Sequence, residues 1–212
     1  TSIRGYLEAM RDGTIPTERY DKYLEIVINE TDRLSKLTND ILALNNLSSS
    51  GMLLDRKDFD INDVIRKTSA SFGAVCMQRR IHIDLLMTEE EMFVNADAER
   101  IKQVLYNLLD NAIKFSQDDG TVTIETTERH SKIFVSVKDQ GIGIPKDEIQ
   151  FVFERFYKSD RSRGKDKKGT GLGLSIVKEI INAHDENINV ISTVDVGTEF
   201  IFSLPLARSM EE

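Results

Sequence analysis

The segment NLLDNAIKFS, residues 107–116, decides how the central part of the chain folds, because it predicts a core helix with one polar stripe. On a helical wheel of about 100° per residue the polar side chains share one narrow sector, and they are Arg100, Gln103, Asn107, Asp110, Asn111 and Lys114. Apolar residues cover most of the remaining circumference. A buried polar group costs free energy unless it finds a partner. The stripe therefore faces either solvent or a bound polar group.

Composition limits the classes of function. The chain has 212 residues, of which 40% are hydrophobic, enough for one domain plus a smaller element or for two small domains. Its formal net charge of −8 argues against nucleic acid as the main partner. A single cysteine, Cys76, excludes an intrachain disulfide and indicates a reducing, cytoplasmic compartment. No apolar run is long enough to cross a bilayer. The chain starts without methionine, so we expect a fragment whose membrane anchor, if present, lies upstream.

The first fifty residues predict a helical hairpin. Between residues 17 and 47 a 3-4-3-4 spacing indicates a long helix that packs on other helices, with seam positions Tyr20, Tyr23, Val27, Glu30, Leu34, Leu37, Ile41 and Leu44. A shorter helix precedes it and ends near Gly13, and Pro16 marks the start of the second arm. The Ser-rich stretch 48–51 is the expected linker. We therefore expect two domains, residues 1–50 and 51–212.

The second domain mixes helical and strand patterns. The expected helices and strands are a helix at 63–78, strands at 81–87 and 93–95, the helix of the opening segment, a hairpin of 121–127 with 132–139, a helix at 172–184, and strands at 188–193 and 198–204. Such a set predicts the α+β class, as a two-layer α/β sandwich with a mixed sheet behind the helical hairpin.

The segment DQGIGIP, residues 139–145, follows an alternating strand. Asp139 shares the core-facing side of that strand with Val135 and Val137, and an inward carboxylate needs a donor. Gly141 and Gly143 would let a flat group approach the backbone. A β-turn with an Asp cap explains the same residues.

A second glycine-rich segment, GTGLGLSIVKEI, begins at Gly169 and runs into an apolar-periodic helix. The first amides of such a helix can bind an anion, although tight packing also selects small residues. The spacing G-x-G-x-G does not match the dinucleotide pattern. A basic loop precedes it, with Lys158, Arg161, Arg163, Lys165, Lys167 and Lys168. This loop suits either a mobile lid over a polyanion or a solvated loop.

Taken together, these motifs carry a family resemblance. NLLDNAIKFS, DQGIGIP, FERFYKSD (residues 153–160), GTGLGLSIV and Gly197-Thr198, in this order, resemble the nucleotide-binding boxes of sensor histidine kinases. The resemblance covers residues 52–206, and the region before them resembles the dimerisation and phosphotransfer hairpin of that family. It implies a Bergerat-type ATP-binding fold with ATP and Mg²⁺ as cofactors.

The resemblance also implies roles for individual residues. Asn107 and Asn111 would hold the metal, Asp139 would accept a hydrogen bond from the adenine amino group, and Asn107, Lys114 and Arg155 would form the catalytic set. Phe156 would hinge or anchor the lid. The residues implied in nucleotide binding are Asn107, Asn111, Lys114, Asp139, Gly141, Gly143, Phe156, Gly169, Thr170, Gly171, Leu172 and Gly173.

The residue type at position 107 distinguishes ATP hydrolysis from phosphoryl transfer to another group. Topoisomerase-like and chaperone-like relatives of the wider superfamily place a water-activating glutamate at this position. An amide cannot take a proton, so we expect slow hydrolysis and a γ-phosphoryl held for another nucleophile.

The nucleophile is not expected among the three histidines, His82, His130 and His184, for which a structural role is the better hypothesis. In the family the acceptor lies in the first hairpin helix, just before a segment like TSIRGYLE. We therefore expect this chain to bind ATP without phosphorylating itself. At residues 185–187 the family commonly has glycines, and Asp185 or Asn187 would have to adopt the left-handed conformation.

The resemblance thus predicts the cytoplasmic catalytic portion of a sensor histidine kinase, which passes phosphate from ATP to a histidine and then to a response-regulator aspartate. The expected partners are a receiver domain and a second copy of the chain, with a hairpin interface weakened by truncation. Two alternatives remain: a serine kinase of the anti-sigma-factor type, and a non-catalytic nucleotide-sensing module.

Overall fold

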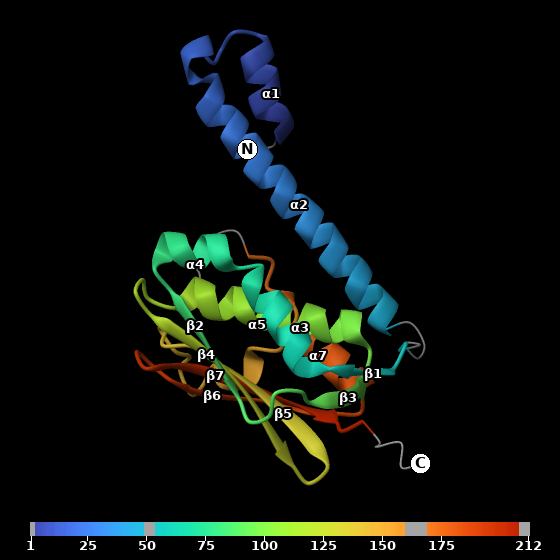
Figure 1. Cartoon of the computed structure of the whole chain (residues 1–212). Coiled ribbons are helices and arrows are strands. Elements are labelled where there is room, and N and C mark those ends of the chain that lie inside the picture. The colour runs from blue at the N-terminus through green and yellow to red at the C-terminus, as the bar shows by residue number, and fades with distance from the viewer. Residues whose placement is uncertain (1–2, 49–53, 160–168, 208–212) are drawn as a thin grey trace.

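A computed structural model describes residues 3–48, 54–159 and 169–207. The chain forms a helical hairpin that extends from an α/β sandwich (Figure 1). This arrangement confirms the predicted fold class.

The hairpin consists of α1 (Ile3–Arg11), a 3-10 turn η1 (Thr17–Arg19) and the long helix α2 (Tyr20–Ser48). Gly13 in the connection has a positive φ of +79°, which favours glycine. A small core of Met10, Ile15 and Val27 holds the two arms together. Of the predicted seam, Leu34 is 57% exposed and Ile41 is also exposed, so the seam is only partly buried by the described residues. The side chain of Leu44 and residues 49–51 of the predicted linker lie outside the described part.

The main sheet has five strands in the order β2-β4-β5-β7-β6, where β2 and β4 are parallel and the other neighbours are antiparallel. The sheet is therefore mixed, as predicted. Its strands are β2 (His82–Met87), β4 (Thr121–Arg129), β5 (Lys132–Lys138), β6 (Ile188–Thr193) and β7 (Gly197–Pro205). The expected strand at 93–95 is β3 (Phe93–Ala96), but it pairs with β1 (Lys57–Asp60) in a separate two-stranded sheet. Strand β1 was not predicted.

The helix predicted at 63–78 is wrong as a single element. The chain forms α3 (Ile61–Ala70) and α4 (Gly73–Arg79), separated at Ser71 and Phe72. The amides of these two residues donate to the carbonyls of Thr68 and Ser69, three residues back, which tightens the last turn and ends α3. The apolar periodicity of the sequence runs through this bend, because Cys76 of α4 is also buried in the main core. The sequence therefore predicted one helix where the chain forms two.

Helices α3, α5 (Ala98–Phe115) and α7 (Gly173–Ala183) cover one face of the sheet (Figure 1). The Asp97 carboxylate caps α5 by accepting from the Arg100 amide. Leu105, Leu108 and Leu109 of α5 are fully buried. The apolar face of the opening segment therefore fixes α5 in the core beside α7 and leaves its polar stripe at the edge of the sandwich. A short 3-10 turn, η2 (Ile149–Phe151), follows β5 in the chain.

Candidate functional site

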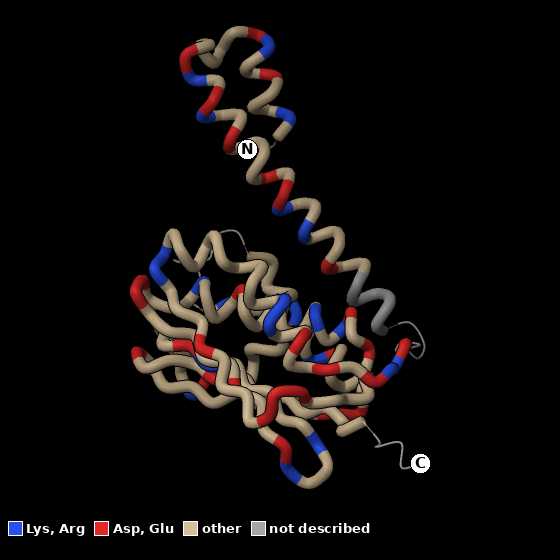
Figure 2. The backbone as a smooth tube through the Cα atoms, viewed as in Figure 1, with Lys and Arg blue, Asp and Glu red and all other residues tan. Residues whose placement is uncertain are grey.

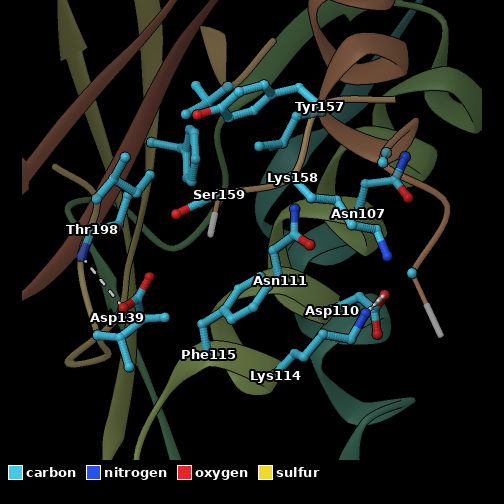
Figure 3. A pocket seen from close by; sticks show the side chains of 18 of the residues that line it. Asn107, Asp110, Asn111, Lys114, Phe115, Asp139, Tyr157, Lys158, Ser159 and Thr198 are labelled. Carbon is cyan, nitrogen blue, oxygen red and sulfur yellow. Dashed lines mark hydrogen bonds and ion pairs between the residues drawn. The ribbon is translucent and has the colours of Figure 1, made fainter. Parts of the chain in front are cut away.

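A pocket lies where the polar stripe of α5 meets the end of β5 and the loop before α7 (Figure 3). The structure thereby brings together residues that the sequence singled out separately. The predicted residues that line it are Asn107, Asn111, Lys114, Asp139, Gly143, Gly169, Thr170, Gly171 and Gly173. The stripe therefore borders a pocket as well as solvent.

Asp139 lies at the deep end of the pocket, directly after β5, and is 6% exposed. Its Oδ1 accepts hydrogen bonds from the amides of Gly141 at 2.8 Å and Thr198 at 3.3 Å, of which Figure 3 shows the second. Burial raises the pKa of this carboxyl to about 6, although both hydrogen bonds favour its charged form. The adjacent walls are apolar, because Ile142, Ile144, Val152 and Phe200 line them. A carboxylate between apolar walls suits a flat heterocycle that carries an N–H donor.

The two glycines after Asp139 are required by the packing of the chain itself. A Cβ on Gly141 would lie 2.5 Å from the Phe115 carbonyl oxygen, and one on Gly143 would lie 2.1 Å from the Thr193 carbonyl oxygen. Gly143 also has a φ of +63°. Gly141 does not line the pocket. It lies against the end of α5, where an isolated bridge joins it to Ser116, and its part in nucleotide binding stays a prediction.

Charged side chains form a network at the other end of the pocket. Asp110 Oδ2 lies 3.2 Å from Lys36 Nζ and 3.6 Å from Lys114 Nζ (Figure 3). Asp110 and Lys36 both line the pocket but were not predicted as site residues. Asp110 could have been found, because it belongs to the polar stripe. Lys36 gave no local signal, because it comes from the hairpin helix α2.

The glycine-rich loop is held by contacts to the segment that precedes it. Gly171 has a φ of +73°, and its carbonyl accepts a hydrogen bond from the Phe156 amide at 2.9 Å. The Phe156 side chain is 63% exposed and does not line the pocket. Leu172 is fully buried in the core and also does not line it. These two residues therefore support the loop rather than the pocket surface.

Arg155 does not line the pocket either. Its Nη2 lies 3.4 Å from Glu179 Oε1 of α7, so in this structure its guanidinium is directed to another partner. Of the predicted basic loop, Lys158 lines the pocket, whereas Arg161, Arg163, Lys165, Lys167 and Lys168 lie outside the described residues.

Of the three histidines, His184 occupies a structural position, whereas His82 and His130 are exposed and their expected structural role stays a prediction. His184 is buried at the end of α7, its Nε2 accepts a hydrogen bond from the Asp97 amide at 3.0 Å, and its Nδ1 lies 2.8 Å from the Ile180 carbonyl oxygen. Nδ1 therefore donates, and the imidazole is neutral. Burial lowers the pKa of His184. The next residue, Asp185, has a φ of +61°, which confirms the left-handed turn expected there.

The donor set of the pocket fits magnesium better than a tightly coordinated transition metal. Among the described residues no group of three or more His, Cys, Asp or Glu could hold a metal. The side-chain oxygens of Asn107 and Asn111 are hard donors, which suit an ion that keeps most of its waters and is bound partly by phosphate. None of the helices in residues 3–48, 54–159 and 169–207 combines the length and hydropathy that crossing a bilayer requires.

Comparison with known families gives two matches. The model of the histidine kinase-, DNA gyrase B- and HSP90-like ATPases matches residues 96–208, and that of the His Kinase A (phospho-acceptor) domain matches residues 1–50. Among curated proteins, the sensor histidine kinase WalK of Bacillus subtilis is 35% identical over all of this chain and 35% of its own length. The sensor histidine kinase YkoH of the same organism is 40% identical over 93% of this chain and 42% of its own length. The chain spans less than half of these relatives.

Solved structures with the same fold include two complexes. Histidine kinase ThkA in complex with the response regulator protein TrrA aligns with a TM-score of 0.78 and 30% identity, over 97% of this chain and 57% of that one. Full-length ShkA in complex with AMPPNP aligns with a TM-score of 0.77 and 26% identity, over 89% of this chain and 40% of that one.

Proposed function

Because the chain belongs to the sensor histidine kinases of this ATPase family, we propose that residues 51–212 bind ATP with Mg²⁺ and present its γ-phosphoryl group to a histidine. A response-regulator aspartate would receive the phosphate next. The helical hairpin of residues 1–50 is the dimerisation and phosphotransfer domain in this proposal.

The observation that carries the proposal is the polarity of the pocket. One end holds the buried Asp139 carboxylate between apolar walls, and the other holds Asn107, Asn111 and Lys114 of α5 beside the glycine-rich loop. An adenine ring suits the first end, because its amino group can donate to Asp139 while guanine presents an acceptor there. A magnesium-bound polyphosphate suits the second end.

Each residue has a distinct role in the proposal. Asn107 and Asn111 orient the metal, Lys114 and Lys158 attract the phosphates, and the loop amides around Thr170 contact them. Asn107 lies beside the start of α7, since a Cβ on Gly173 would be 3.6 Å from Asn107 Oδ1. Bound Mg²⁺ would supply charge neutralisation at the phosphates. Arg155 would take part only after leaving Glu179.

Hydrolysis is not the proposed reaction. The amide of Asn107 cannot accept a proton from water, so this chain contributes positioning and charge. The acceptor is a histidine outside the 212 residues, because residues 1–50 contain none. In this proposal the chain binds ATP but does not phosphorylate itself.

The proposed partners are a receiver domain and a second copy of the chain. Exposed apolar side chains on the hairpin suit a helix-packing interface, namely Leu7, Leu24, Ile28, Leu34, Ile41 and Leu42. Acidic and basic residues are interspersed along α2 (Figure 2), which does not favour nucleic acid as a partner. The free, buried Cys76 is consistent with a cytoplasmic location.

Two measurements test the proposal. Calorimetry should show binding of Mg-ATP but not of Mg-GTP, and the Asp139→Asn variant should lose ATP binding. Incubation with γ-labelled ATP should then leave this chain unlabelled but give acid-labile, alkali-stable label on a version extended upstream, which a receiver domain removes. Acid-stable label would indicate a serine kinase instead, and binding without any transfer would indicate a nucleotide-sensing module.

A further inference from the structure

The hairpin helix α2 packs directly against the sandwich beside the pocket. The helix runs over the sandwich (Figure 1) and contacts α7. Its Leu37 packs against the main hydrophobic core. Lys36 and Asp40 lie one turn apart on the same helix and flank this apolar contact. One turn of α2 is therefore held by both apolar and polar contacts.

The polar contacts of this turn reach two groups of the pocket. Thr170 of the glycine-rich loop donates its hydroxyl hydrogen to Asp40 Oδ2, at an oxygen–oxygen distance of 2.8 Å. Lys36 Nζ lies 3.2 Å from Asp110 Oδ2, and Lys36 also lines the pocket. The Thr170 oxygen in turn accepts a hydrogen bond from the Leu172 amide at 3.3 Å. Helix α2 thus contacts the loop that is proposed to hold the phosphates.

Resting on the proposed binding of a nucleotide in this pocket, we infer that Asp40 is a positioning residue that opposes polyphosphate binding through Thr170. In the docked arrangement the Asp40 carboxylate accepts the hydroxyl hydrogen of Thr170, so this hydroxyl cannot donate to a phosphate. Helix α2 must then move away from the loop before the phosphates of a nucleotide can engage it.

Electrostatics supports this inference. A nucleoside triphosphate would bring several negative charges next to the Asp40 carboxylate, and Asp110 adds a second carboxylate at the same end of the pocket. Asp110 also pairs with Lys36 and Lys114, so both lysines are partly neutralised while α2 is docked. Burial raises the pKa of Asp40, although the Thr170 hydrogen bond and Lys36 act in the other direction. Its charge is thus poorly solvated in the docked state.

Docking and nucleotide binding are then reciprocally linked. If docking of α2 weakens nucleotide binding by some factor, nucleotide binding weakens docking by the same factor. Binding of ATP would release the sandwich from the hairpin, whereas loss of the nucleotide would restore the contact between Asp40 and Thr170.

The test compares Mg-ATP affinities of the whole chain by calorimetry. Asp40→Ala removes the charge and the acceptor, and we expect it to tighten binding by about fivefold or more, within the usual range of coupling between sites. Asp40→Asn removes the charge but keeps an acceptor oxygen, and it should give part of this gain. Asp32→Asn makes the same change of charge at an exposed position of α2 and should leave the affinity within about twofold.

A distance measurement between α2 and α7 provides a second test, because a purely structural role of Asp40 would not make this distance depend on ATP. Spin labels on cysteines at the exposed positions Asp32 of α2 and Asn182 of α7 report whether the helix is docked. Mg-ATP should lengthen or broaden the distance distribution, and Asp40→Ala should do so without nucleotide. Unchanged or weaker ATP affinity in Asp40→Ala, or distances unaffected by ATP, would overturn the inference. Failure of every chain, including the unaltered one, to bind Mg-ATP would refute the proposed function itself.

Discussion

Replacing Asp139 with asparagine should stabilise the nucleotide-free chain while abolishing nucleotide binding. The carboxyl is 6% exposed, and burial raises its pKa from 3.8 to about 6. An acid with a raised pKa binds its proton more tightly in the folded state. Its contribution to the free energy of unfolding is therefore most favourable below pH 3.8, falls as the pH rises, and is constant above pH 6.

The size of the effect follows from the shift of the pKa. The destabilisation is about 3 kcal/mol at pH 8 and about half of that at pH 5, where most of the folded chain is already protonated at this site. The amide side chain of the Asp139→Asn variant cannot ionise, so the variant lacks this contribution. Asparagine accepts the amide hydrogen bonds less well than a carboxylate, but that loss is nearly independent of pH. The change of the stability difference between the two pH values therefore isolates the charge.

Urea unfolding of both chains at pH 5 and pH 8 measures this change. The advantage of Asp139→Asn over the unaltered chain should grow by about 1 to 2 kcal/mol from pH 5 to pH 8. Asp84→Asn, at an exposed position of β2, serves as the matched control and should show no such growth. A stability difference that is the same at both pH values would refute the reasoning. Binding of ATP to Asp139→Asn with unchanged affinity would refute the proposed role of the carboxylate.

Three further predictions concern other parts of the sandwich. Asn111→Ala should weaken ATP binding about tenfold in the presence of Mg²⁺, as seen by calorimetry, and should have little effect when a chelator removes the metal. Gly143→Ala should destabilise the chain by about 2 to 4 kcal/mol in urea unfolding, because φ is +63° and the added Cβ would meet the Thr193 carbonyl, whereas Gly73→Ala, with open space around it, should be neutral or stabilising. His184→Leu should cost about 2 to 3 kcal/mol, because the Asp97 amide loses its acceptor and the Ile180 carbonyl keeps only the backbone amide of residue 184 as a donor, and it should leave histidine label on the extended chain intact. Since burial lowers the pKa of His184, the stability that its neutral form contributes is present above pH 6.5 and is lost as the pH falls below it, which the thermal melting temperature of the unaltered chain and of His184→Leu should reveal.

Much of the sandwich could be predicted because its signals are local. The apolar face of α5, the alternation in β4 and β5 and the glycine-rich start of α7 each depend on residues close in the sequence. Asp139 was predicted to point inward from the alternation of β5 alone, and its burial confirms this.

The misses depend on contacts between distant segments. Strand β1 has two exposed residues followed by two half-buried ones, so its four residues lack a recognisable alternation, and it is held by pairing with β3. The close packing at Gly141 and Gly143 could not be predicted, because the atoms that exclude a side chain there belong to Phe115 and Thr193. Lys36 reaches the pocket from the helical hairpin, 74 residues away from its partner Asp110 in the sequence. Such contacts require the tertiary fold.

The burial of Cys76 has a practical consequence for experiments on this chain. It is the only cysteine in the sequence and is buried at the side of α4 that faces the core. Burial raises the pKa of its thiol, so little of the reactive thiolate forms near neutral pH. A cysteine introduced on the surface will therefore react with a maleimide or a spin label well before Cys76 does. Labelling of the natural cysteine should therefore be low, and optical or magnetic probes can be placed on the hairpin and the sandwich without replacing Cys76.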